Sequence, residues 1–147
     1  MYPLHPFTVH FPIALLLANG LLTFLYLRRG DQALETSAYH CLVLGWLSAL
    51  PAVVTGAIDA VRRLTGPDVP RDNLLLAWVN AHAAVGIVLI IVYGYALQHR
   101  RRHPQILADP QKRRGYLRLL LLGVVLVILD GWLGGYLVYT LRLGVGR

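Results

Sequence analysis

The chain has 147 residues, of which 56% are hydrophobic and 14% charged, and its mean hydropathy is +0.56. Soluble proteins carry about 25% charged residues, so an ordinary soluble domain is excluded, and the length fits one domain over residues 1–147. A single cysteine excludes a disulfide scaffold, and the net charge of +7 does not predict nucleic-acid binding, because the basic residues stand at the ends of long apolar runs.

Four successive apolar runs are long enough to cross a membrane, for which a helix needs about 20 residues. Strands are not expected, because no run alternates in the manner of a barrel strand. The fourth run contains one charged residue, Asp130. We therefore predict an all-α fold, a polytopic membrane four-helix bundle, with helices at about 8–28, 38–61, 74–98 and 117–140.

Polar connectors separate the expected helices. Arg28 and Arg29 end the first helix, residues 65–70 form a turn rich in Gly and Pro, and residues 99–115 carry six basic residues. Residues that favour helix N-caps precede the second and third helices, namely Thr36 or Ser37 and Asp72 or Asn73.

The distribution of basic residues predicts the orientation. Nine of the 14 Lys and Arg residues flank the first and third connectors, and five lie elsewhere. Basic residues stay on the cytoplasmic side, so both termini are expected to face the exterior of a bacterial cytoplasmic membrane (N-out, C-out). No basic segment precedes the first apolar run, which favours a retained anchor over a cleaved signal peptide.

Histidines within the apolar runs are the first candidates for a site, because polar groups in lipid are costly. In the predicted orientation His5, His10 and His82 all lie toward the exterior face. Histidine is a common axial ligand of haem iron, and Gly86, one helical turn after His82, leaves space for a flat ring. Close packing of two helices explains the same glycine without a ligand.

Two aspartates are candidate supporting residues. Asp59, near two arginines, forms either a surface ion pair or a hydrogen bond to a ligating histidine. Asp130 lies mid-span, where an ionised carboxylate costs about 2.5–3.5 kcal/mol, so we expect it to face the bundle, protonated or beside a His, Asn or Tyr. The glycines that follow, Gly131, Gly134 and Gly135, predict a close helix contact within the bundle or with another subunit.

Both ends of the chain resemble one bacterial family. Residues 5–15, HPFTVHFPIAL, resemble the HP-x-x-VHFPIAL opening of the uncharacterised four-helix membrane proteins of domain of unknown function 2231. Residues 131–139, GWLGGYLVY, resemble the GxLGGxLVY ending of that family. Residues 144–146 resemble its GVGV tail, although residues 141–143 replace the basic residue and histidine that more often precede the tail.

The resemblance implies a four-helix membrane fold over the whole chain. Asp59 and His82 fall where the family tends to have an acidic residue and a histidine. Paired histidines at one membrane face imply a haem or metal site in such proteins. A c-type cytochrome would then be a fitting partner for electron transfer.

Three functions remain open. In the first, the protein is a b-type cytochrome in which His10 and His82 bind haem b iron and His5 is a substitute for His10. In that hypothesis Gly86 makes room for the ring, and Asp59 or Asp130 orients a ligand. In another hypothesis, His5, His10, His82 and a carboxylate bind a divalent metal such as zinc or iron.

The remaining hypothesis, an accessory subunit, needs no cofactor. The bundle would be an accessory subunit of a larger respiratory or photosynthetic complex, with its glycine face and four aromatic residues as contacts: Trp78, Trp132, Tyr136 and Tyr139. The sequence lacks GxSxG, HExxH, P-loop and GxGxxG motifs, so a carrier or subunit is expected rather than an enzyme. The expected surroundings are the lipid bilayer, with no nucleic acid.

Overall fold

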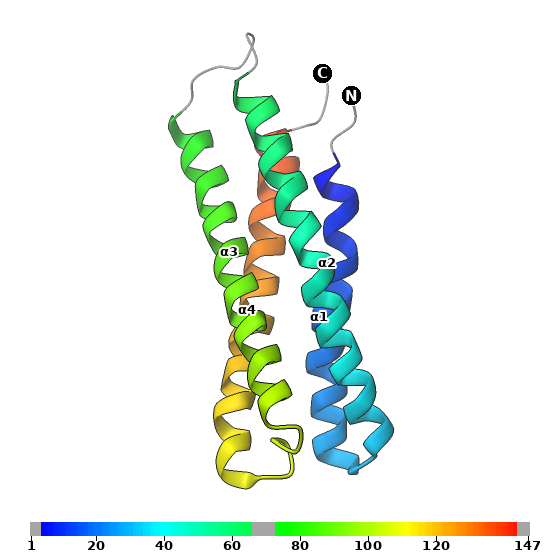
Figure 1. The fold of residues 1–147 in the computed structure, drawn as a ribbon. Helices are drawn as coiled ribbons and strands as arrows, with labels where there is room; N and C mark the ends of the chain where they lie inside the picture. Colours follow the sequence, from blue (N-terminus) through cyan, green and yellow to red (C-terminus); the bar gives the residue numbers. More distant parts are fainter. Residues whose placement is uncertain (1–3, 66–72, 144–147) are drawn as a thin grey trace.

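The computed structural model describes residues 4–65 and 73–143 of the chain. Every regular element in these residues is a helix, and the helices run up and down beside one another (Figure 1). They are α1 (His5–Arg29), α2 (Gln32–Leu64), α3 (Asn73–Arg102) and α4 (Pro110–Tyr139). All four are long and apolar enough to cross a membrane, which confirms the predicted all-α four-helix fold.

The second helix begins at Gln32 rather than near residue 38. Gly30, with a φ of 70°, ends α1, and the Asp31 side chain then accepts a hydrogen bond from the Ala33 N–H. Asp31 is therefore the N-cap. The prediction of Thr36 or Ser37 as the cap is wrong, because the charged residues before them belong to the helix and extend it beyond its apolar part.

The fourth helix also begins early, at Pro110 rather than near residue 117. The Asp109 carboxylate caps it by accepting hydrogen bonds from the N–H groups of Gln111 and Lys112. These hydrogen bonds hold the pKa of the Asp109 carboxyl below its usual range. The third helix begins at Asn73, and the alternative cap Asp72 lies outside the described residues.

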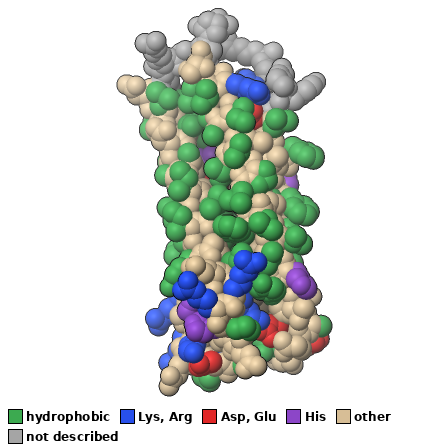
Figure 2. Space-filling view, in the orientation of Figure 1, with side chains coloured by type: hydrophobic (Ala, Val, Ile, Leu, Met, Phe, Trp, Pro, Cys, Tyr) green, Lys and Arg blue, Asp and Glu red, His purple; other side chains and the backbone are tan. Residues whose placement is uncertain are grey.

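The outer surface of the bundle is divided by chemistry. Hydrophobic side chains cover its sides, whereas Lys and Arg gather around the end opposite the two termini (Figure 2). Many large apolar side chains are exposed, such as Leu121 at 65% and Ile91 at 63%. Their exposure is appropriate for contact with lipid, where leaving an apolar side chain outside the bundle carries no hydrophobic penalty.

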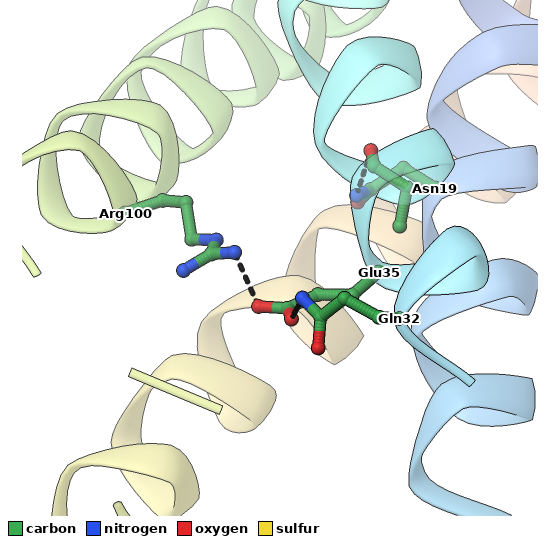
Figure 3. A network of polar contacts seen from close by, with 5 residues as sticks. Asn19, Gln32, Glu35 and Arg100 are labelled. Carbon is green, nitrogen blue, oxygen red and sulfur yellow. Dashed lines mark hydrogen bonds and ion pairs between the residues drawn. The ribbon is translucent and has the colours of Figure 1, made fainter. Parts of the chain in front are cut away.

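A buried polar network links three helices near the basic end (Figure 3). The Glu35 carboxylate of α2 accepts hydrogen bonds from Arg100 of α3 and from Gln32. Nearby, Asn19 of α1 is 1% exposed and donates a hydrogen bond of 2.8 Å to the Ala38 carbonyl. The sequence did not predict this network, because Glu35 and Arg100 were assigned to polar connectors outside the bundle.

Two glycines of α4 lie in opposite surroundings, and this difference predicts a stability effect. A Cβ at Gly123 would lie 2.6 Å from Cζ of the fully buried Tyr93, whereas a Cβ at Gly131 would meet nothing within 4 Å. We expect Gly123→Ala to lower the free energy of unfolding by about 1–3 kcal/mol through overpacking. Gly131→Ala is expected to be neutral or to stabilise the helix by up to about 1 kcal/mol.

Thermal unfolding in a mild detergent, followed by circular dichroism, measures this difference. Equal melting temperatures for Gly123→Ala and Gly131→Ala would contradict the packing of Tyr93 against α4 described above.

Candidate functional site

The predicted bundle-facing position of Asp130 is confirmed, and its partner is His82. Nδ1 of His82, on α3, lies 2.8 Å from Oδ1 of Asp130, on α4. The two side chains are 19% and 22% exposed. Apart from this contact, both atoms are buried without a hydrogen-bond partner. The pair therefore brings a histidine and an aspartate into contact between two membrane-spanning helices.

The glycines near this pair lie in different surroundings. A Cβ at Gly134 would lie 3.4 Å from Cε1 of His82, so Gly134 is the small residue beside the imidazole. A Cβ at Gly86 would lie 3.7 Å from Oδ2 of Asp130, so Gly86 adjoins the carboxylate instead. Gly131 is open, and the nearest atom to Gly135 belongs to Tyr139 of its own helix. Among the described residues, Gly131 and Gly135 thus form no close contact with another helix.

His5 is held by α2 at three points. Its ring Nδ1 lies 2.8 Å from the Ala52 carbonyl oxygen, and its backbone N–H donates a hydrogen bond of 2.8 Å to Oδ2 of Asp59. A Cβ at Gly56 would lie 2.9 Å from the same ring. Asp59 therefore contacts the backbone of His5 and not its ring, unlike the predicted hydrogen bond to a histidine ring.

The histidines brought together are His5 and His82. Their ring centroids lie 5.8 Å apart with an angle of 67° between the ring planes. His10 is exposed, and it follows His5 by five residues, which rotates it by about 140° around the helix axis. Because α1 begins at His5 rather than near residue 8, both histidines lie on one regular helix and cannot share a face. Of the two candidate residues of α1, His5 is therefore the one that lies beside His82.

Both imidazoles have an oxygen atom beside Nδ1. A carbonyl oxygen only accepts hydrogen bonds, so Nδ1 of His5 carries the proton that it donates to Ala52. In His82 the oxygen beside Nδ1 is Oδ1 of Asp130, at 2.8 Å. Nε2 of His5 is then unprotonated when the ring is neutral, which is the arrangement typical of histidines that bind a metal through Nε2.

A metal site with three or more side-chain ligands is not present in the described part of the chain. No group of three His, Cys, Asp or Glu residues is positioned there to hold a metal ion. His5 and His82 therefore form a pair of potential ligands rather than part of a larger set.

The contact between Asp59 and α1 predicts a capping effect. Leu4, the N-cap residue of α1, has no side chain that can accept from the helix, and the first turn has no acidic residue. The Asp59 carboxylate supplies this acceptor from α2. We expect Asp59→Ala to lower the free energy of unfolding by about 0.5–2 kcal/mol, as other cap removals do.

Asp59→Asn is the matched variant, because its side-chain oxygen still accepts a hydrogen bond. Denaturation in detergent is expected to rank the wild type first, Asp59→Asn second and Asp59→Ala last. A fully stable Asp59→Ala protein would show that the contact does not cap α1.

Comparison with known proteins gives one family match. The family model described as "Predicted membrane protein (DUF2231)" matches residues 1–147. No curated protein and no solved structure matches the chain.

Proposed function

We propose that this chain, which belongs to the DUF2231 family of membrane proteins, is a small b-type cytochrome. In this proposal His5 and His82 are the residues that would hold the haem. The observation that carries the proposal is the pair of neighbouring imidazoles from α1 and α3, each with an oxygen atom 2.8 Å from its Nδ1. When bound, the haem would supply a centre that accepts and releases one electron.

The spacing of the rings supports this proposal. A nitrogen–metal bond is about 2.0 Å long, so two imidazoles on opposite sides of one metal ion have centroids roughly 6 Å apart. The observed centroid distance is 5.8 Å. Glycines adjoin both rings, Gly56 at His5 and Gly134 at His82, so no side chain from these positions covers the imidazoles.

The two imidazoles differ in their supporting groups. A carboxylate beside Nδ1 makes an imidazole a stronger donor to a metal, and Oδ1 of Asp130 lies 2.8 Å from Nδ1 of His82, so Asp130 would strengthen His82 as a ligand. His5 has the neutral Ala52 carbonyl in the same position. Asp130 therefore has an orienting and tuning role, and Asp59 positions His5 through its backbone.

We infer that the histidine end of the bundle faces the exterior of a bacterial cytoplasmic membrane. Lys and Arg gather at the opposite end, and basic residues remain on the cytoplasmic side (Figure 2). A c-type cytochrome outside the membrane would then be on the same side of the membrane as the histidine pair.

An absorption spectrum tests the proposal. The protein is purified in mild detergent from a host supplied with haem, next to His5→Ala and His10→Ala variants. We expect a Soret band in the wild type and in His10→Ala, and its loss in His5→Ala. A folded wild-type protein without a Soret band would overturn the proposal.

The outer face of α4 supports the alternative proposal, that the bundle is a non-catalytic accessory subunit of a larger respiratory or photosynthetic complex. Trp132 is 57% exposed, and its ring stacks on Tyr136 at a centroid distance of 5.8 Å beside the open Gly131. Such a face suits close contact with another helix. Native mass spectrometry of the gently solubilised protein is expected to detect additional subunits, which Gly131→Leu should release; a monomer throughout would contradict this second role.

A further inference from the structure

A groove of about 390 Å³ lies between α3 and α4 near the basic end of the bundle, far from the histidine pair. Its lining includes His99 and Arg118 as polar residues and Leu119 and Leu122 as apolar ones. Tyr95 also lines the groove and stacks on His99, with ring centroids 6.0 Å apart and 15° between planes. The groove thus combines cationic and apolar surfaces in one place.

The polar and apolar parts of the groove lie at different depths in the membrane, with the polar part nearer the surface. Arg118 is the innermost basic residue of α4, since residues 119–139 contain no Lys or Arg. Leu122 lies one helical turn deeper, about 6 Å along the axis, and Tyr95 lies one turn deeper than His99 on α3. A ligand that fits would have an anionic group at the surface and a hydrocarbon chain pointing into the bilayer.

Gly115 leaves space in the groove. A Cβ at this position would meet nothing within 4 Å, although Gly115 lies in the regular part of α4. Glycine lowers helix stability by about 1 kcal/mol relative to alanine. The position therefore offers room for a ligand, and a larger side chain there can fill the groove without disturbing the helix.

We propose that this groove binds one anionic phospholipid from the surrounding bilayer. The Arg118 guanidinium binds the headgroup phosphate, for which its planar set of donors is well suited, and His99 lines the same end. An acyl chain lies along Leu119 and Leu122. Basic pockets between membrane helices on the cytoplasmic side bind anionic headgroups in this manner. The proposal does not depend on the haem.

Native mass spectrometry with purified, detergent-solubilised protein tests the proposal by counting retained lipids after addition of phosphatidylglycerol or phosphatidylcholine. We expect the wild type to retain one phosphatidylglycerol and to bind phosphatidylcholine more weakly. Arg118→Gln removes the charge-assisted hydrogen bonds to phosphate and is expected to weaken phosphatidylglycerol binding on the order of tenfold. Gly115→Leu, which keeps all charges, should weaken it by filling the groove.

Arg101→Gln is the matched control. Arg101 is exposed at the same end of the bundle, and it lies about 160° around α3 from His99, outside the groove. The Arg101→Gln variant should retain the lipid as the wild type does. The proposal would be overturned if Arg101→Gln and Arg118→Gln lost lipid equally, or if both lipids bound equally. Full lipid retention in Gly115→Leu would overturn it as well. Inorganic phosphate that displaces the lipid completely at equal concentration would also overturn it, since the acyl chain would then contribute nothing.

Discussion

Replacing His82 with alanine is expected to abolish haem retention, so that the purified variant has no Soret band while its helix content is unchanged. The substitution removes one of the two facing imidazoles and leaves His5 without a partner across the bundle. It also leaves Oδ1 of Asp130 without its contact. A single remaining ligand cannot hold the ring from both sides, so we expect loss rather than a partial decrease.

Asp130→Asn is the matched variant for this experiment. It keeps the size of the side chain and allows an oxygen atom beside Nδ1 of His82, but it removes the negative charge of the carboxylate. Loss of such a supporting carboxylate typically weakens metal binding 10- to 100-fold, so we expect a weaker haem affinity in titrations with haem. A normal Soret band in His82→Ala would contradict the assignment of the ligand, and wild-type affinity in Asp130→Asn would contradict the role of the carboxylate.

Removing Glu35 is expected to cause the largest loss of stability in the chain. The side chains of Glu35 and Arg100 are 7% and 11% exposed, and the carboxylate also accepts from Gln32. Glu35→Ala leaves the Arg100 guanidinium buried without its counter-charge. Such changes cost about 3–5 kcal/mol, which unfolding by a denaturing detergent measures.

The double variant Glu35→Leu, Arg100→Leu separates the charge from the packing. Replacing both partners with apolar residues leaves no unpaired charge. Proteins in which a buried ion pair is replaced in this way often lose little free energy of unfolding. We therefore expect the double variant to be more stable than Glu35→Ala. A double variant that is as unstable as the single one would indicate that the network stabilises the fold through contacts other than the ion pair.

The four spans could be predicted from the sequence because charge-free runs of sufficient length have few alternatives in a chain this apolar. The helix ends could not be predicted in the same way. Charged residues such as Glu35 and Lys112 marked the edges of the apolar runs, but the helices continue through them beyond the apolar part. The capping residues Asp31 and Asp109 carried the missing signal, because each precedes the helix that it caps.

Part of the candidate site was also visible in the sequence. Polar side chains are costly inside apolar runs, so His82 and Asp130 were each expected to have a partner. The structure shows that they contact each other. The pairing of His82 with His5 rather than His10 depends on where α1 begins and on its rotation, which a sequence pattern does not reveal. The Glu35–Arg100 contact joins residues 65 positions apart, so no local spacing predicts it.

The central claim, that two imidazoles from different helices bind one haem, is tested most directly by electron paramagnetic resonance of the oxidised wild-type protein purified with haem. Coordination by His5 and His82 predicts a low-spin ferric signal typical of two imidazole ligands, unchanged in His10→Ala. A high-spin signal, or a low-spin signal that persists in His5→Ala, would contradict the claim.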